Sequence, residues 1–327
     1  MGMTDFPNGI TSFGIPIFGG GIMSQGKAWF VKPYSGSDGN SGGSANKSFK
    51  TLAKALSSAT ADRNDVVYLF AESNTAANTT DYQSATLDWN KDLVHLVGVG
   101  SPVNVSNRSR VAFLSTYDTA SNLFTLSANG CMISNISFFA GVVGTNPTGC
   151  MNVTGSRNHI TNCHIAGIGH ANNDINNAYS LQISAGQENI FSNCTIGLDT
   201  IARGTGANSE LRLVSAATRN KFKSCDFTTY AEAAGHQFVI VGASGLDRYT
   251  TFDNCKFINM PTGIASGTTM TEAFDVGATP GGLLLLKGCT MVGCDDWEAN
   301  VESAITFIDG GAPTNNTSGL AVLVEAT

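Results

Sequence analysis

A short pattern built on cysteine returns about every thirty residues along the chain. Each copy has an apolar residue three positions before the cysteine and another two positions after it. Clear copies read NHITNCHI, NIFSNCTI, NKFKSCDF and TTFDNCKF, and a fifth surrounds the last cysteine of the set. The cysteines are Cys163, Cys194, Cys225, Cys255 and Cys289. Self-similarity at such a period is the signature of a solenoid, in which each unit packs against its neighbours.

The spacing inside each copy predicts a bend. The cysteine and the apolar residue two positions later point to the same face of a strand, because side chains alternate along it. The apolar residue three positions before the cysteine breaks this alternation, so the chain must bend between them. The residue just before the cysteine is of a type that tolerates a bend. These residues are Asn135 (followed by Ile136 in place of cysteine), Asn162, Asn193, Ser224, Asn254 and Gly288.

Equivalent residues of successive units should lie above one another. We therefore expect the five cysteines to form an internal column, and we expect Asn135, Asn162, Asn193 and Asn254 to stack and share side-chain hydrogen bonds. A further strand is expected ahead of each cysteine. These strands are predicted at Tyr179–Ser184, Glu210–Ser215, Gln237–Val241, Ala273–Val276 and Ala304–Ile308. The expected fold class is all-β, a parallel β-helix of roughly eight or nine coils.

Composition agrees with short strands and turns and argues against several partners. The chain has 37 glycines and only 13% charged residues. Its 18 Lys and Arg residues are scattered and its net charge is −7, so we expect no nucleic-acid partner. Purely apolar runs such as Leu283–Leu286 are far shorter than a membrane span of about 20 residues, and no signal peptide is recognised, so no membrane association is expected. The eight cysteines are interpreted as free buried thiols.

Three segments are predicted: an N-terminal arm over residues 1–27, a strand, loop and capping helix over residues 28–64, and the β-helix shaft over residues 65–327. Ser48 is the expected N-cap of the helix, which should cover the open end of the shaft. Its apolar face is expected to contain Phe49, Leu52, Ala53 and Leu56. The first shaft strands are predicted at Val66–Phe70 and Leu93–Val99.

The segment FVKPYSGSDGNSGGSANKSFKTLAKAL and the later NC-x-[IF] units resemble pectin-lyase-like right-handed β-helix proteins. The resemblance covers about residues 28–327 and implies a right-handed coil, but it is nearly silent on chemistry. The leader FPNGITSFGIP ahead of such a shaft resembles tailed-phage virion proteins. That resemblance implies a particle component, located in the virion after synthesis in the host cytoplasm. Shafts of this type commonly associate as parallel trimers, so it also implies a homotrimer.

The arm is too apolar to be a solvated tail. A flexible leader is the alternative, but a segment that becomes ordered on a partner surface is favoured. The expected partner is a major capsid protein or another virion protein. The residues expected to dock on it are Phe6, Ile10, Phe13, Ile15, Ile17 and Phe18.

No catalytic, cofactor or metal site is predicted. The motifs of pectate lyases are absent, and of the polygalacturonase motifs only a pair, Asp295–Asp296, is present. Acidic residues such as Asp226 and Asp253 occupy different positions in their repeats, so they do not form the paired carboxylates that glycoside hydrolysis needs. His159, His164 and His170 fall in one coil, where exposed strand histidines are a commoner interpretation than a metal triad.

The leading hypothesis is therefore a non-enzymatic phage virion structural protein, a capsid decoration protein anchored by its arm with the β-helix projecting outward. The alternative is a tailspike-like protein that binds or depolymerises a host-surface polysaccharide. Exposed aromatic residues repeating in register would favour glycan binding, but Trp89, Trp297, Tyr82, Tyr117 and Tyr230 do not repeat in this way.

Overall fold

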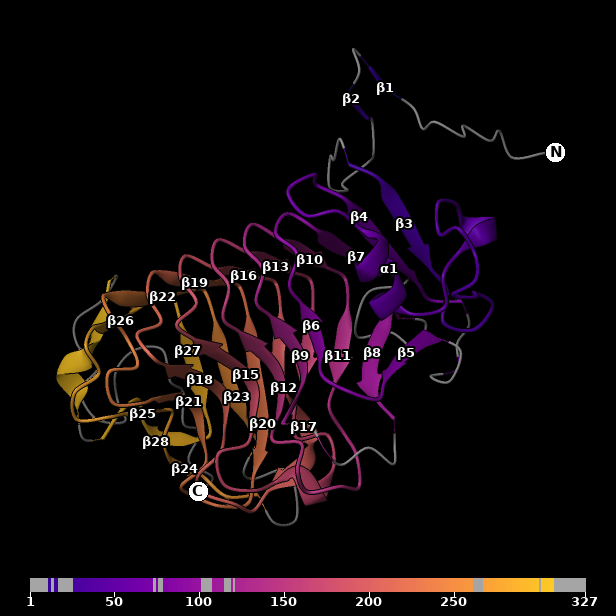
Figure 1. The fold of residues 1–327 in the computed structure, drawn as a ribbon. Helices are drawn as coiled ribbons and strands as arrows, with labels where there is room; N and C mark the ends of the chain where they lie inside the picture. Colours follow the sequence, from indigo (N-terminus) through magenta and orange to yellow (C-terminus); the bar gives the residue numbers. More distant parts are fainter. Residues whose placement is uncertain are drawn as a thin grey trace.

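The computed structural model confirms a right-handed parallel β-helix (Figure 1). It describes residues 11–12, 15–16, 26–72, 75, 79–100, 108–114, 119, 121–260, 267–299 and 301–308. Three parallel sheets, named here sheets I, II and III, run along the axis, and each coil contributes one strand to each sheet. The described residues form seven complete coils with partial coils at both ends, fewer than the eight or nine that were expected.

The strands of each sheet follow one another in chain order along the axis. Sheet I contains β3 (Ala28–Val31), β4 (Val66–Phe70), β7 (His95–Val99), β10 (Met132–Ser134), β13 (His159–Thr161), β16 (Ile190–Ser192), β19 (Asn220–Lys223), β22 (Tyr249–Asp253), β26 (Leu283–Lys287) and β29 (Ile305–Phe307). Sheet II contains β5 (Thr80–Gln83), β8 (Arg110–Phe113), β11 (Ser137–Phe139), β14 (His164–Ala166), β17 (Thr195–Arg203), β20 (Asp226–Ala231), β23 (Lys256–Asn259) and β27 (Thr290–Val292).

Sheet III contains β6 (Leu87–Trp89), β9 (Asn122–Leu126), β12 (Gly149–Val153), β15 (Tyr179–Ser184), β18 (Ser209–Val214), β21 (Gln237–Val241) and β25 (Phe274–Val276). Two short pairs stand apart: β24 (Met270–Glu272) with β28 (Cys294–Asp296), and β1 (Thr11–Ser12) with β2 (Ile15–Pro16). The helical segments are α1 (Leu52–Ser58) and the 3₁₀ turns η1 (Ala45–Lys47), η2 (Ala171–Asn173) and η3 (Glu302–Ala304).

Like residues stack on like residues inside the shaft. In sheet I, Phe191, Phe222 and Phe252 are in register on successive strands. Their rings stack with centroids 4.8 and 5.0 Å apart, and all three side chains are fully buried. Burying large aromatic side chains in this way supplies much of the free energy that stabilises a fold. The column therefore explains why the repeat keeps an apolar residue three positions before the cysteine.

The N-terminal helix differs from the prediction at its start. Thr51, not Ser48, is the N-cap, and its hydroxyl accepts a hydrogen bond from the amide of Lys54. The Asp38 carboxylate accepts hydrogen bonds from the amides of Lys50 and Thr51, so the chain turns into the helix three residues later than predicted. The buried helix residues are Leu52, Ala55 and Leu56, whereas the expected Ala53 is exposed. In Figure 1, α1 lies at the N-terminal end of the coil stack.

Asp65 joins this cap to the first coil. Its buried carboxylate accepts hydrogen bonds from the amide of Lys27, the indole of Trp29 and the amide of Thr60. Burial disfavours its charge, but these hydrogen bonds outweigh that effect and hold the pKa of Asp65 below its usual value. The last residue of the expected arm, Lys27, is thus already held against the shaft.

One predicted strand belongs to a different sheet. The strands expected near residues 179, 210, 237 and 273 are β15, β18, β21 and β25 of sheet III. The segment predicted at Ala304–Ile308 is instead β29, which pairs with β26 in sheet I. Its alternating residues fit either sheet, so the pattern alone did not distinguish them. Among the described residues, no helix has the length and apolar character needed to cross a membrane.

Candidate functional site

The five repeat cysteines lie at the corner between sheets I and II, each directly after a residue in the left-handed backbone region. The φ angles of these preceding residues are between 51° and 58°: Asn162, Asn193, Ser224, Asn254 and Gly288. Asn135 has the same conformation, with φ of 57°. Asn and Gly tolerate this region better than most residues, which explains their place in the repeat.

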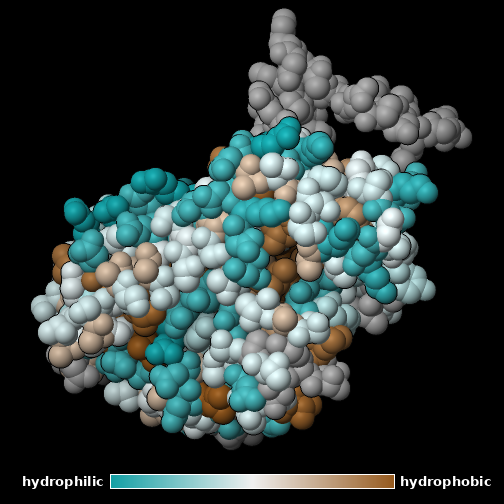
Figure 2. Space-filling model, in the orientation of Figure 1, coloured by the Kyte–Doolittle hydropathy of each residue, from teal (hydrophilic) through white to brown (hydrophobic). Residues whose placement is uncertain are grey.

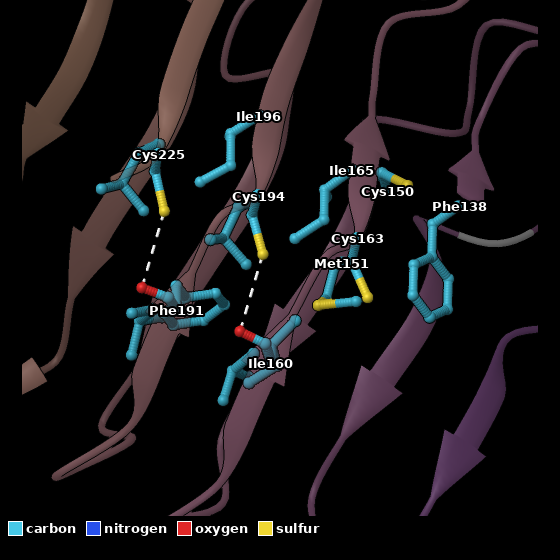
Figure 3. Packing of buried hydrophobic residues seen from close by; sticks show 14 of the residues in the cluster. Phe138, Cys150, Met151, Ile160, Cys163, Ile165, Phe191, Cys194, Ile196 and Cys225 are labelled. Atoms are coloured by element: carbon cyan, nitrogen blue, oxygen red, sulfur yellow. Dashed lines mark hydrogen bonds between the residues drawn. The ribbon is translucent and has the colours of Figure 1, made fainter. Parts of the chain in front are cut away.

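The thiols are buried and follow one another along the axis, as Figure 3 shows for Cys163, Cys194 and Cys225. Each Sγ donates to a backbone carbonyl of the preceding coil, for example Cys194 to Ile160 at 3.6 Å and Cys225 to Phe191 at 3.5 Å. The thiols of Cys194, Cys225, Cys255 and Cys289 are neighbours in series along this corner. All five residues are at most 2% exposed. Burial raises the pKa of the Cys163 thiol to about 12.

The asparagine side-chain ladder lies at another position than the one predicted. Among the described residues, no hydrogen bond joins the side chains of Asn135, Asn162, Asn193 and Asn254, and that of Asn135 donates instead to Gly98. The ladder is formed by fully enclosed asparagines five positions before the cysteines: Asn158, Asn189 and Asn220. The amide of Asn158 donates to Oδ1 of Asn189, and that of Asn189 donates to Oδ1 of Asn220, both at 3.0 Å.

The histidines of one coil do not converge. His159 Nε2 contacts the Ser192 hydroxyl at 2.8 Å, and His164 Nε2 contacts the Gly197 carbonyl oxygen at 3.0 Å. His170 accepts from the amide of Asn172 in the following turn. Within the described ranges, no group of three or more His, Cys, Asp and Glu residues could hold a metal ion. Of the acidic pair, Asp296 accepts a hydrogen bond from the amide of Trp297.

Sheets II and III meet at a buried charge network that the sequence patterns did not reveal. Arg203, at the end of β17, lies 3.4 Å (Nε to Oε1) from Glu210 in β18, and both side chains are fully buried. His236 Nε2 lies 3.6 Å from the same carboxylate oxygen. Burial disfavours the charge of Glu210, but the Arg203 cation and the Ser180 hydroxyl, which donates to Oε2, outweigh this and keep the pKa of Glu210 below its usual value. The sequence pattern placed Glu210 only at the start of a predicted strand.

The surroundings fix the protonation of this network. Asn208 donates its Nδ2 to Asp174, so its Oδ1 faces Nδ1 of His236, which must carry the proton. Nε2 of His236 can then accept from the Thr229 hydroxyl at 2.9 Å, and burial lowers the pKa of His236. Gly197 leaves room for the carboxylate, because a Cβ there would lie 2.6 Å from Oε2 of Glu210. The enclosed network can hold the corner of the coil, but it cannot touch a substrate.

The outward face of sheet III carries a continuous column of side chains that face solvent. Buried residues flank each of them, for example Met151 and Val153 around Asn152, so the strands alternate inward and outward. The column is in register across all seven strands of the sheet. Its members, named here the sheet III column, are Asp88, Thr125, Asn152, Gln182, Arg212, Ile240 and Asp275.

Most of the sheet III column is polar and half-buried. Gln182 Nε2 donates to Asn152 Oδ1 at 3.2 Å, so neighbouring coils are linked on this face. Arg212 is fixed by a hydrogen bond to the Asn177 carbonyl, and burial lowers its pKa. Burial raises the pKa of Asp275 at the C-terminal end of the column. At a coil spacing of about 4.8 Å, the seven positions extend over roughly 29 Å.

The surface shown in Figure 2 is mostly hydrophilic or neutral, with hydrophobic residues in separate small areas. Scattered apolar residues of this kind are normal for a protein surface. The expected docking residues Phe6, Ile10, Phe13, Ile17 and Phe18 lie outside the described residues, as does Tyr117. The backbone of Ile15 lies in β2, which pairs antiparallel with β1.

Neither a protein-family profile nor a curated protein sequence matches the chain. Solved structures of similar fold include a rhamnogalacturonan lyase, with a TM-score of 0.55, 17% identity, and coverage of 82% of this chain and 68% of that one. Pectate lyase Pel9A has a TM-score of 0.55 and 15% identity, with coverage of 86% and 68%. Pectin methylesterase PemA from Erwinia chrysanthemi has a TM-score of 0.53 and 16% identity, with coverage of 86% and 80%. These similarities show the pectin-lyase-like β-helix fold.

Proposed function

We propose that the chain is a virion β-helix protein that binds a polysaccharide along the sheet III column and is anchored to the particle by its N-terminal arm. The observation that carries the glycan-binding part is the unbroken register of the column from Asp88 to Asp275. An extended polymer with many hydroxyl groups can follow such a row, one coil after another, because six of its seven side chains, all but Ile240, can form hydrogen bonds.

The chemistry of the column suits a sugar polymer better than a nucleic acid. Asn152 and Gln182 offer both donors and acceptors, which match hydroxyl groups. Arg212 adds a planar donor group that can bind a sugar carboxylate in bidentate fashion. Because Gln182 and Arg212 are already held by neighbours, less conformational entropy is lost on binding. The fold shared with polysaccharide-acting enzymes is compatible with this proposal.

The experiment is a binding screen with a panel of purified bacterial capsular and O-chain polysaccharides on an array. We expect at least one to bind, and we expect Arg212→Ala to weaken that binding at least tenfold. Arg248→Ala is the matched control, because Arg248 is a largely exposed arginine paired with its neighbour Asp247. Retention of full affinity by Arg212→Ala, or binding of no polysaccharide at all, would overturn the proposal.

The same samples are assayed for release of reducing ends. We expect none, because the buried Glu210 is enclosed and the column acids Asp88 and Asp275 stand at opposite ends of the sheet. Sustained release from any polysaccharide would instead establish the depolymerase alternative.

Capsid decoration is the finer part of the proposal, and it is supported by the apolar leader of the sequence. The truncation that tests it should remove residues 1–25 and keep Gly26 and Lys27, since Lys27 hydrogen-bonds to Asp65. The truncated shaft should keep its circular dichroism spectrum but lose co-sedimentation with particles that lack the protein. Undiminished co-sedimentation would rule out anchoring by the arm. Sedimentation velocity of the full chain tests the proposed homotrimer.

A further inference from the structure

The interior cysteine column has chemistry that the proposed function does not use. Five buried thiols follow one another at the same corner of successive coils, and each contacts a carbonyl of the coil before, as Figure 3 shows for Cys194 and Cys225. They are free cysteines. Their Sγ atoms repeat the same contact with the coil before, at 3.8 Å for Cys163, 3.6 Å for Cys255 and 3.4 Å for Cys289. The strands on both sides are in register, so the spacing of the thiols follows the spacing of the coils.

This spacing is unfavourable for disulfides between coils. Parallel strands lie about 4.8 Å apart, and side chains in register leave the backbone in nearly the same direction. A disulfide needs Cβ atoms about 3.5–4.5 Å apart, with the two side chains turned toward each other. Joining neighbours such as Cys194 and Cys225 would therefore require the backbone of two packed coils to move.

The same spacing suits a cation held between two sulfurs. With the zinc–sulfur length of about 2.3 Å as a guide, two metal–sulfur bonds placed end to end span about 4.6 Å. That span is close to the distance between neighbouring coils. We infer that the column binds soft divalent cations of the Hg²⁺ type, each in linear two-coordinate geometry between the thiolates of successive coils. Soft thiolate ligands favour soft cations, so sulfur chemistry points the same way.

Charge selects a divalent cation for this site. Binding converts two thiols and one Hg²⁺ into a neutral S–Hg–S unit and releases two protons. A monovalent cation of similar size would leave one net negative charge in the apolar interior, which is unfavourable. A tetrahedral cation such as Zn²⁺ is also disfavoured, because no group of three or more metal-binding side chains converges in the described part of the chain.

The test counts the cations that the folded chain retains. The protein is incubated with Hg²⁺, excess glutathione removes singly bound ions, and native mass spectrometry gives the number that remains. The five-thiol column holds two separate neighbouring pairs, so we expect two retained ions. X-ray absorption at the mercury edge should show two sulfur neighbours for each ion, and Hg²⁺ should raise the melting temperature, because it binds the folded state.

Serine variants separate neighbouring pairs from the mere number of thiols. Cys225→Ser leaves two neighbouring pairs and should still retain two ions, whereas Cys194→Ser should retain one. Cys194→Ser combined with Cys255→Ser leaves no neighbours and should retain none. The control combines Cys131→Ser with Cys150→Ser, which are buried cysteines outside the column, and should retain two.

Retention that depends only on the number of cysteines, and not on their adjacency, would overturn the inference. So would a third sulfur neighbour in the absorption spectrum. If the double variant does not fold, the contrast between Cys194→Ser and Cys225→Ser decides the question, because each removes one thiol.

Discussion

The Asp81 carboxyl group should make the stability of the protein depend on pH. Asp81 lies in β5, is only 3% exposed, and accepts hydrogen bonds from the amide of Leu52 at 3.1 Å and from Gln83 Nε2 at 2.6 Å. Burial raises its pKa from 3.8 to about 7, because those two hydrogen bonds only partly offset the loss of solvent. The folded state therefore binds a proton that the unfolded chain releases near pH 4.

The sign and size of the effect follow from this difference in pKa. A carboxyl group whose pKa is raised by folding contributes stability below the unfolded pKa, and the contribution is lost as pH rises through the folded pKa. The full difference is worth about 4 kcal/mol. Roughly 3 kcal/mol of it should be lost between pH 5 and pH 8. Asp81→Asn keeps a neutral acceptor for the Leu52 amide at every pH, so the variant should be more stable than the parent at pH 8.

The assay is urea unfolding followed by circular dichroism at both pH values. The readout is the difference in the free energy of unfolding between parent and variant. It cancels the contribution of buried histidines, whose lowered pKa values change stability in the opposite direction over the same pH range. These histidines are His95, His159, His164 and His236. Asp247→Asn serves as the control, since this carboxylate is more than half exposed. A parent–variant difference that does not change between the two pH values would refute the reasoning.

Three further predictions concern the interior. Phe222→Ala should lower the free energy of unfolding by about 3–5 kcal/mol, because it removes the middle ring of a buried stack. Phe222→Leu should lower it by less. A loss below about 1 kcal/mol for Phe222→Ala in urea unfolding would contradict the stacking argument. Asn189→Ala should lower the free energy of unfolding by about 1–3 kcal/mol. It should also speed hydrogen exchange at the amide of Asn158, which loses its acceptor. Unchanged exchange would show that the ladder is dispensable. Glu210→Ala should lower the free energy of unfolding by about 3–5 kcal/mol, because it leaves the Arg203 cation buried without a partner. If this charge is the cause, replacing both residues by leucine should restore most of the thermal stability.

The repeat was sufficient to predict the architecture because its period and its local spacing carry independent information. The period of Cys163, Cys194 and Cys225 predicts stacked coils, and the residue before each cysteine predicts the corner. The strands of sheet III follow from alternation alone. Local patterns of this kind remain visible in a sequence because each coil packs only against its neighbours.

The buried polar contacts could not be predicted in the same way. The ladder of Asn158, Asn189 and Asn220 has the same period as the cysteines, so alignment five positions upstream of each cysteine would have found it. The pair Arg203 and Glu210 occurs in one coil only, so the repeat pattern does not predict it. Alternation predicts that a charged side chain such as that of Glu210 is exposed. Only the structure shows that the long strand β17 encloses it. The start of α1 was misplaced because Asp38, distant in sequence, accepts hydrogen bonds from the amides of Lys50 and Thr51, which precede the helix.

The parallel register has a mechanical consequence for a shaft that is held at one end and pulled at the other. The strands lie across the axis, so a pull along the axis acts on the hydrogen bonds between coils. Because each coil is bound chiefly to the one before and the one after, such a load opens coils one at a time, beginning at the end that is pulled. An extension record should therefore show a series of small steps, each releasing about thirty residues, in place of a single rupture.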